Sequence, residues 1–174
     1  MPFPDSAFDA AWSIWTLEHV PNPEMALNEM RRVVKSNGYV LLQPAWNTDP
    51  WLPRGLRKRP YGELGWRDRL TKFSIPLREL HWYRAFYLRQ VRVIRSLVYH
   101  IGRAPVRLRF TSTTPSYEES SWESDADSTS SLDRHETLLW FTSRGDRCLN
   151  CSESALLLRR GNACPAGLVI QVHK

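Results

Sequence analysis

The chain has 174 residues, of which 42% are hydrophobic, so it can bury one core and a single domain is the default expectation. Its three cysteines do not suggest a disulfide framework, because such frameworks belong to small secreted chains that usually have an even cysteine count. The sequence shows no secretory leader and no apolar run of membrane-spanning length. We therefore expect a cytoplasmic protein.

The net charge of +6 is unevenly distributed along the chain. Residues 1–53 carry −3, whereas residues 54–110 carry +12, from 15 basic and 3 acidic side chains. Residues 111–136 carry −6 and residues 137–174 carry +3. The central basic segment is therefore the candidate for contact with a partner.

The first predicted element is a strand from Phe8 to Trp15. This stretch is almost continuously apolar, which is typical of a strand buried on both faces, as parallel strands of α/β sheets are. Pro21 ends it, Asn22 is a suitable N-cap, and Pro23 suits the first position of a helix. A helix is expected to follow.

The predicted helix has one apolar stripe, formed by Met25, Leu27, Met30, Val33 and Val34. Asn37 and Gly38 are predicted to end the helix in a left-handed turn, and Tyr39 to Leu42 to form a second strand. A parallel crossover of this length is right-handed almost without exception, so the two strands should lie side by side with the helix across one face.

Three motifs in this region carry a resemblance to a known family. They are Phe-Pro-Asp-Ser-Ala-Phe-Asp, Leu-Glu-His-Val-Pro-Asn-Pro and Glu-Met-Arg-Arg-Val-Val-Lys before a glycine turn. The segment resembles the second half of a class I S-adenosylmethionine-dependent methyltransferase of the methyltransferase-type 11 group. The resemblance implies an α/β fold with a Rossmann-like, doubly wound sheet, in which residues 1–46 supply the fourth and fifth strands.

The resemblance also exposes two departures from the family. Ser36-Asn37-Gly38 replaces the usual Pro-Gly-Gly, which asparagine tolerates because it adopts positive φ. The Gly-rich turn and the acidic residue that hold the cofactor in this family precede the matching segment, and the 174 residues contain neither. We therefore expect the C-terminal portion of a longer enzyme, inactive alone, with S-adenosylmethionine as its cofactor by resemblance.

The resemblance implies a site at the end of the first strand. Trp12, Ser13 and Ile14 would pass along the methionyl part of the cofactor through backbone groups, and Glu18 and His19 would face the same cleft. His19 is a candidate general base, because its unperturbed pKa is near neutrality. The alternative is that His19 only packs or hydrogen-bonds at the strand–helix turn, and the role of Glu18 is equally open.

Residues 47–115 are expected to form a basic insertion. Residues 47–72 are rich in proline and glycine and predict a loop, which either covers the substrate or is a solvated insertion. Trp46, Trp51 and Trp66 flank this predicted substrate edge and can stack on a flat or cationic ligand.

From Leu77 to Gly102 the periodicity predicts a long basic amphipathic helix. Its apolar stripe consists of Leu80, Tyr83, Tyr87, Val91, Ile94, Val98 and Ile101, and its opposite side of Arg78, Arg84, Arg89, Arg92, Arg95 and Arg103. The helix can cap the sheet, rest on an anionic membrane surface, or offer its arginines to a phosphate-rich partner. We favour the cap with outward arginines, because an apolar stripe ordinarily faces the core.

Residues 116–136 are acidic and rich in serine and predict a loop whose carboxylates offset the arginines through exposed, weak pairs. Residues 137–174 are expected to close the fold, with a helix capped by Asp133 and closed by Gly145, strands at 148–151 and 155–158, and a terminal strand at 168–172. A helix followed by strands is the closing pattern that the resemblance implies.

The cysteines at Cys148 and Cys151, with Cys164 and His173 as further ligands, invite a metal or redox interpretation. A zinc site needs a second close pair, and a thioredoxin-like site opens a helix after a strand. Neither context is present, so we predict no metal site and chemically incidental cysteines.

Taken together, the sequence predicts a truncated methyltransferase that aligns a donor and a nucleophile, with a small-molecule or lipid-like acceptor. The alternative is a non-catalytic remnant that binds an anionic membrane surface or a partner through the basic helix. A nucleic-acid-binding module has the charge but no recognition motif, so no specific nucleic acid is expected.

Overall fold

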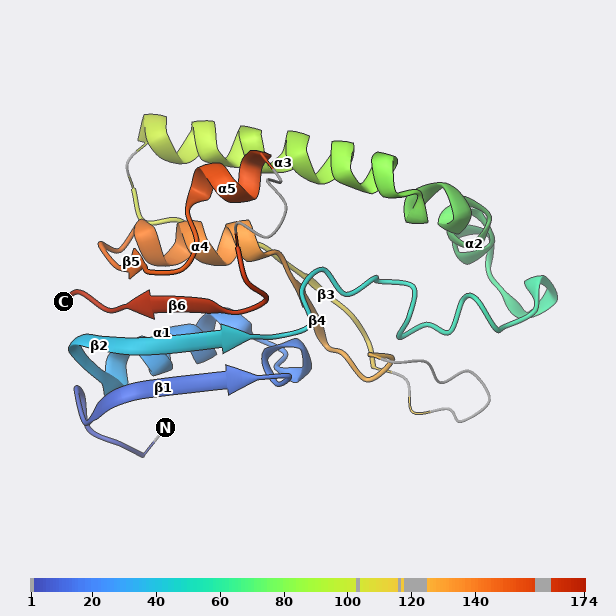
Figure 1. Cartoon of the computed structure of the whole chain (residues 1–174). Helices are drawn as coiled ribbons and strands as arrows, with labels where there is room; N and C mark the ends of the chain where they lie inside the picture. Colours follow the sequence, from blue (N-terminus) through green and yellow to red (C-terminus); the bar gives the residue numbers. More distant parts are fainter. Residues whose placement is uncertain (1, 103, 116, 118–124, 159–163) are drawn as a thin grey trace.

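The computed structural model describes residues 2–102, 104–115, 117, 125–158 and 164–174. The first half contains β1 (Phe8–Ile14), the 3-10 helix η1 (Leu17–His19), α1 (Pro23–Val33), β2 (Val34–Gln43), the 3-10 helix η2 (Tyr61–Glu63), α2 (Trp66–Glu79) and α3 (His81–Gly102). The second half contains β3 (Phe110–Ser112), β4 (Ser130–Leu132), α4 (Arg134–Thr142), β5 (Arg147–Cys148), α5 (Glu153–Leu158) and β6 (Leu168–Gln171). The described chain is thus a mixed α/β fold (Figure 1).

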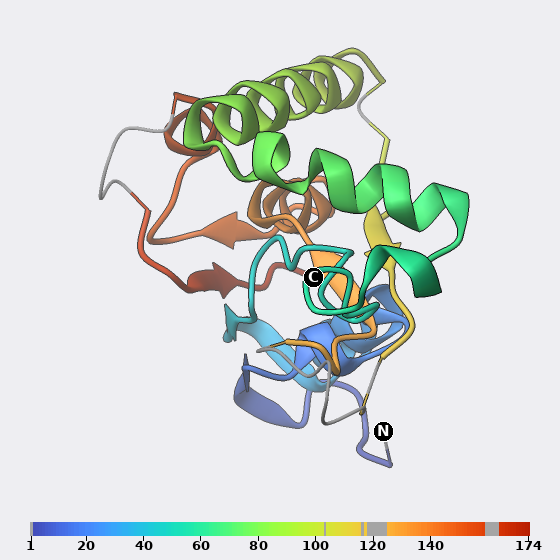
Figure 2. The ribbon, with the colours of Figure 1, turned by 90° about the vertical axis from the view of Figure 1, so that its right-hand side faces the viewer.

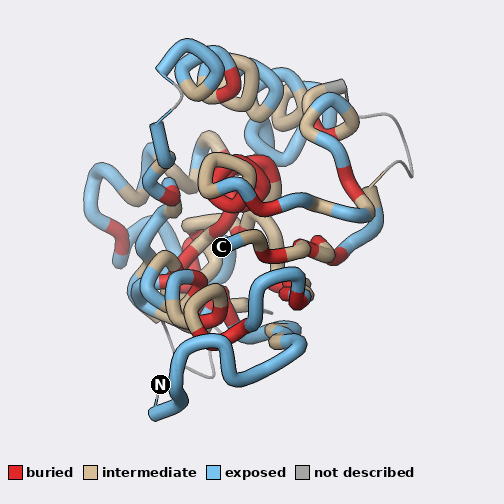
Figure 3. Tube along the Cα trace, turned by 90° about the vertical axis from the view of Figure 1, so that its left-hand side faces the viewer, coloured by how far each residue is buried: buried red, intermediate tan, exposed pale blue. Residues whose placement is uncertain are grey.

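The main sheet has the strand order β1-β2-β6-β5. β1 and β2 are parallel, with Ala11 opposite Val40, whereas β6 is antiparallel to both β2 and β5. Val40, Leu42 and Ile170 are fully buried and form one core cluster with side chains of α1 and α4. The predicted side-by-side parallel pair is confirmed. Figure 3 shows the buried residues concentrated in the centre of the molecule.

The prediction that the first strand is buried on both faces is wrong. In the described chain β1 pairs with β2 alone, so it forms an edge of the sheet. The Trp12 side chain is 71% exposed, and Ile14 is also exposed, whereas Ala11 packs against the core. The continuous apolar run therefore predicts the strand correctly, but it does not predict whether one or both of its faces are buried.

The N-cap of α1 is confirmed, since the Asn22 side chain accepts a hydrogen bond of 3.1 Å from the Met25 backbone N–H. Met25 itself is exposed, contrary to the predicted stripe, whereas the other members of that stripe are buried. The helix ends at Val33, earlier than expected, and Asn37 takes the predicted left-handed conformation with φ of 64°. Asn37 therefore lies within β2, which begins at Val34, and does not mark the end of the helix.

α4 supplies most of the large buried side chains of the second half. The Asp133 cap is confirmed, because its carboxylate accepts hydrogen bonds from the backbone N–H groups of His135 and Glu136, at 2.9 and 3.3 Å. Trp140 and Phe141 are fully buried, and Gly145 follows the helix with φ of 87°. The expected helix is thus present where the capping signals place it.

The strand predicted at 155–158 is wrong, because these residues are helical in α5. The Ser152 side chain accepts a hydrogen bond from the Ala155 backbone N–H at 3.2 Å, as a helix cap does. Leu156 is the buried member of the run. Four consecutive apolar residues are too few to distinguish the two periodicities, and the cap decides between them.

The prediction of incidental cysteines is wrong for two of the three. Cys151 and Cys164 form a disulfide with a Cα–Cα distance of 4.9 Å and a sequence separation of 13, and Cys148 is free. The bond ties the segment after β5 to the segment before β6. A lone bridge is not a framework of the kind that spacing patterns reveal, which is why the cysteine count did not indicate it.

Replacing Cys151 and Cys164 together by serine is expected to lower the free energy of unfolding by about 3 kcal/mol, because the disulfide restricts the unfolded chain. Urea unfolding of the oxidised wild type and of the double variant measures the difference. Cys148→Ser is the matched control and should leave the urea midpoint unchanged. Thiol titration of the denatured wild type without reductant should detect one thiol, that of Cys148. Detection of three thiols would contradict the disulfide.

The predicted loop at 47–72 and the predicted helix from Leu77 both require correction. α2 begins at Trp66, inside the expected loop, and ends at Glu79, and α3 begins at His81. The earlier residues of the loop pack around a small separate core of Trp51, Leu56, Leu64 and Ile75. Figure 2 shows α2 and α3 as successive helices on the outside of the molecule.

The predicted orientation of α3 is inverted, because three of its four arginines, Arg84, Arg92 and Arg95, face carboxylates of the protein, whereas Arg89 is exposed. Arg92 pairs with Asp133 at 2.6 Å and Arg95 with Glu136 at 2.7 Å, and all four side chains are largely buried. The acidic carboxylates do offset the arginines as predicted, but through buried pairs. Arg103 and residues 116 and 118–124 of the predicted acidic loop lie outside the described residues.

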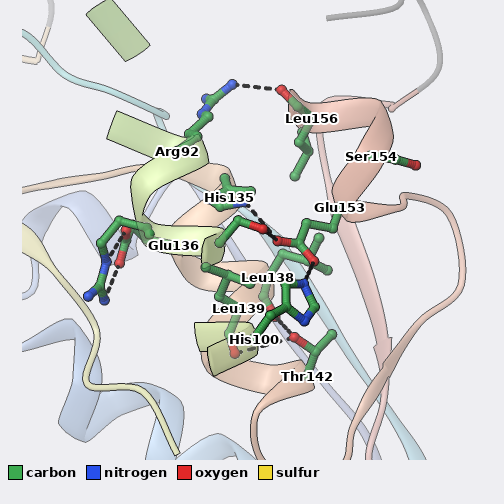
Figure 4. A network of polar contacts seen from close by, with 12 residues as sticks. Arg92, His100, His135, Glu136, Leu138, Leu139, Thr142, Glu153, Ser154 and Leu156 are labelled. Atoms are coloured by element: carbon green, nitrogen blue, oxygen red, sulfur yellow. Dashed lines mark hydrogen bonds and ion pairs between the residues drawn. The ribbon is translucent and has the colours of Figure 1, made fainter. Parts of the chain in front are cut away.

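A second set of polar contacts joins α3 to α4 and α5 (Figure 4). The Glu153 carboxylate accepts a hydrogen bond from Ser96 Oγ at 2.5 Å and lies 3.1 Å from His100 Nε2 and 3.4 Å from His135 Nε2. Burial lowers the pKa of His135, which has no exposed surface. The inward side of α3 is therefore polar and paired along its length.

Candidate functional site

The carboxyl end of β1 brings together the residues that the sequence singled out. After Ile14 the chain turns at Trp15, whose φ is 50°, and the Trp15 backbone N–H donates to the Gln43 carbonyl at the end of β2. η1 follows at once and carries Glu18 and His19. The predicted pair thus lies directly beyond the two parallel strands, at the edge where ligands of open α/β sheets bind.

Glu18 and His19 differ sharply in exposure. The Glu18 side chain is 1% exposed, and its Oε2 atom has no hydrogen-bond partner among the described residues. The His19 side chain is 37% exposed, and its Nε2 atom lies 3.9 Å from Glu18 Oε1. An accessible imidazole therefore lies beside a buried carboxylate that has capacity for a further donor.

Asp127 completes the group on the other side of the imidazole. His19 Nδ1 lies 3.4 Å from the Asp127 carbonyl oxygen and 3.7 Å from its carboxylate. The residues that follow Asp127 are held against η1 by two hydrogen bonds. The Thr129 backbone N–H donates to the Glu18 carbonyl, and Ser130 Oγ donates to the Leu17 carbonyl. The sequence did not indicate this role for Asp127, because one aspartate in an acidic serine-rich stretch has no local signal.

A histidine between two carboxylates is suited to proton transfer. One carboxylate can orient the imidazole through one ring nitrogen while the other nitrogen exchanges a proton, and both carboxylates stabilise the imidazolium. We call Glu18, His19 and Asp127 the His19 group. Its imidazole lies between two carboxylates, one near each ring nitrogen. The distances of 3.4–3.9 Å are longer than those of aligned hydrogen bonds.

A cavity of about 400 Å³ lies beside the loop that leaves β2. Its lining is shared by this loop, α3 and the β3–β4 ribbon and includes Asp49, Trp51, Tyr83, Tyr87, Thr111 and Ser131. Trp51 Nε1 is buried and has no hydrogen-bond partner among the described residues, so it can donate to a ligand oxygen. Burial raises the pKa of Asp49, and Arg84 at 3.4 Å partly offsets this effect.

The three predicted substrate-edge tryptophans are not brought together. Trp51 lines the 400 Å³ cavity, whereas Trp46 lines a second one of about 200 Å³ and donates from Nε1 to the Ala166 carbonyl at 2.7 Å. Asn47 borders both cavities. Trp66 lies at the start of α2, is 68% exposed and lines neither. Two of the three therefore line cavities near the loop that leaves β2.

Comparison with known proteins finds a match in the first quarter of the chain. A family model described as a methyltransferase domain matches residues 1–42. The sterol 4-C-methyltransferase strm-1 of Caenorhabditis elegans is 35% identical over 51 residues, which are 29% of this chain and 15% of that protein. The matched family segment contains β1, η1, α1 and nearly all of β2. Residues 1–42 are thus similar to a segment of a methyltransferase domain, and the resemblance to the class I S-adenosylmethionine-dependent enzymes is confirmed.

Proposed function

We propose that this chain takes part in S-adenosylmethionine-dependent methyl transfer to an apolar, lipid-like acceptor. The observation that carries the proposal is the position of the His19 group at the end of the parallel strand pair within the matched methyltransferase segment. The parallel crossover and the closing α4, β5 and β6 support a Rossmann-like arrangement of the wider domain. The matched segment is only 15% of the relative, so the activity and substrate of that protein are proposals for this chain.

Several groups at the end of β1 suit the cofactor. The exposed indoles of Trp12 and Trp15 offer flat apolar surfaces for an adenine ring, and Ser13 and Ile14 supply backbone groups. The unpartnered Glu18 Oε2 costs free energy while it lacks a donor, and a polar hydrogen of the cofactor would satisfy it. When bound, S-adenosylmethionine supplies an activated methyl group on a sulfonium.

The residues of this chain would handle the proton and the acceptor. His19 accepts a proton from the acceptor, and the carboxylates of Glu18 and Asp127 stabilise the resulting imidazolium. The 400 Å³ cavity binds the apolar body of the acceptor against Tyr83 and Tyr87, with Trp51 Nε1 donating to an acceptor oxygen. The sterol acceptor in the relative's name agrees with a ligand of this class.

The 174 residues contain no Gly-rich strand turn, and we propose that alone they bind the cofactor weakly. A lost hydrogen bond to a charged group costs about 1.5–3 kcal/mol, and several such losses take a micromolar dissociation constant to about millimolar or weaker. Turnover by these residues alone is accordingly expected to be undetectable.

Photocrosslinking tests the proposed cofactor site. The chain is irradiated with millimolar methyl-labelled S-adenosylmethionine and digested with trypsin, whose first cleavage after Met1 follows Arg31. We expect the label in peptide 1–31, because it carries the end of β1 and the His19 group. Unlabelled S-adenosylmethionine should compete for the label, whereas ATP, which has adenine but no sulfonium, should not.

Two outcomes would contradict the proposal. Label spread over the tryptophan-containing peptides of α2 and α3 in proportion to their exposure would indicate unspecific photochemistry. Label in no peptide at a millimolar concentration of cofactor would favour the alternative, a non-catalytic protein that acts through its basic helix.

A further inference from the structure

The outward side of α3 is apolar and open to solvent. Six large side chains on this side are each more than half exposed: Phe86, Tyr87, Ile94, Leu97, Val98 and Ile101. Tyr87, Ile94, Leu97, Val98 and Ile101 are separated by three, four or seven residues, and Phe86 lies eleven residues before Leu97. All six therefore lie on one side of a helix of 22 residues and form one stripe. Scattered exposed apolar residues need no explanation, but six large ones on one side of a single helix indicate a contact surface.

α2 also carries an exposed apolar row. Trp66, Leu70, Phe73 and Leu77 are exposed at steps of four, three and four, which places them on one side of that helix. Leu80, at the junction of the two helices, is also exposed. The two exposed rows together are called the α2–α3 face. Both helices lie on the outside of the fold (Figures 1 and 2).

The fold holds α3 with this side outward. Arg92, Arg95 and Ser96 anchor the opposite side to α4 and α5 through Asp133, Glu136 and Glu153. Turning the helix about its axis would bury the stripe but leave three carboxylates of the core without these partners. The exposed stripe is therefore a stable feature of the folded protein.

The charge around the α2–α3 face favours an anionic occupant. The segment 54–110 carries a net charge of +12, which includes Arg92 and Arg95 in their inward ion pairs, and α3 contains no acidic residue. Arg67, Arg78 and Arg89 are exposed beside the apolar rows. A second copy of this chain would bring an equal positive charge against the first, whereas anionic headgroups would neutralise it.

We infer that the α2–α3 face docks on the surface of an anionic lipid bilayer. The apolar rows enter the boundary between headgroups and acyl chains, and the bordering arginines contact the headgroups. A long convex row fits a bilayer because acyl chains adapt to it, whereas a protein partner would need a matching groove. The inference does not depend on the proposed methyl transfer, although Tyr83 and Tyr87 of α3 also line the 400 Å³ cavity.

Vesicle co-sedimentation with the 174-residue chain tests the inference. Vesicles of phosphatidylcholine with about one quarter phosphatidylglycerol should bind the chain at least about tenfold more tightly than pure phosphatidylcholine. Raising the salt from 50 to 500 mM should remove most of that difference, because it shortens the screening length. Binding to neither vesicle, or equal binding to both, would overturn the inference.

The double variant Ile94→Ser with Leu97→Ser tests the stripe itself. Both side chains are more than half exposed, so the fold should be retained, while vesicle binding should fall by at least about tenfold. Leu149→Ser is the matched control, since Leu149 is an exposed leucine after β5, and it should bind vesicles like the wild type. Circular dichroism and the urea midpoint establish that each variant folds.

The aggregation state separates a bilayer from other occupants. Light scattering of the wild type without lipid is expected to give a monomer. A dimer that the Ile94→Ser, Leu97→Ser variant dissolves would assign the α2–α3 face to a second copy and overturn the inference. If the variant binds vesicles as tightly as the wild type, the membrane contact lies elsewhere on the chain, and the inference is overturned as well.

Discussion

Asp133→Ala is expected to lower the free energy of unfolding by about 3–5 kcal/mol, because the substitution removes one partner of a buried ion pair. The carboxylate lies 2.6 Å from Arg92 and accepts two backbone hydrogen bonds at the start of α4. Arg92 is only 12% exposed, so its guanidinium would stay buried beside a vacated position. The loss of the helix cap adds to the effect.

Urea unfolding followed by circular dichroism measures this effect. Asp133→Asn is the informative companion, because an amide oxygen can still accept from the His135 backbone N–H while the charge facing Arg92 is lost. We expect the asparagine variant to lie between the wild type and Asp133→Ala. A wild-type midpoint for Asp133→Ala would mean that the arginine side of α3 is not the packed side, and it would remove the basis for an outward apolar stripe.

The orientation of α3 shows what a periodic pattern can and cannot predict. The pattern gives the helix and its two sides correctly, but the choice of the buried side depends on what lies opposite. Here Asp133 and Glu136 lie opposite, 41 residues along the chain from Arg92 and Arg95. For the same reason a substitution such as Ile94→Asp, which would be destabilising at a core position, is now expected to be tolerated, since Ile94 is exposed.

The strand–helix–strand unit was predictable because its signals are local. Asn22 and Pro23 start α1, and Asn37 takes the left-handed conformation that the sequence indicated. The disulfide between Cys151 and Cys164 was not predictable, because it depends on where β5 and β6 place the two segments. The spacing and periodicity of residues in the sequence do not predict a tertiary contact of this kind.

The candidate site likewise has a part that local sequence signals predict and a part that depends on tertiary structure. Glu18 and His19 are adjacent to the end of a predicted strand, and the structure places them there. Asp127 reaches His19 from 108 residues away, and the acidic segment that carries it was interpreted as a loop that only balances charge. The contact arises because β4 pairs with β3 and packs on η1, which fixes the residues just before it. Only the tertiary structure brings that carboxylate to the imidazole.

Asp146→Ala is expected to be as destabilising as the Asp133 substitution, because Asp146 joins α1 to the C-terminal residues through hydrogen bonds with Arg31 and His173. Its side chain has no exposed surface and accepts hydrogen bonds from Arg31 of α1, at 2.7 and 3.1 Å, and from the His173 backbone N–H at 2.8 Å. Removing the carboxylate leaves the Arg31 guanidinium with only the carbonyls of Arg144 and His173.

An arginine in this setting retains its charge, so the loss of its counter-ion should cost about 3–5 kcal/mol. The matched control is Asp9→Ala, which removes an ion pair of similar length, 2.8 Å to Lys35, between two exposed side chains and should leave stability unchanged. Equilibrium urea unfolding of both variants gives the comparison. Equal midpoints for Asp146→Ala and Asp9→Ala would show that α1 and the C-terminal residues are joined by the apolar core alone. A lowered midpoint for Asp146→Ala only would show that residues 1–42 depend on the closing half of this chain for their fold, and hence that the His19 group does as well.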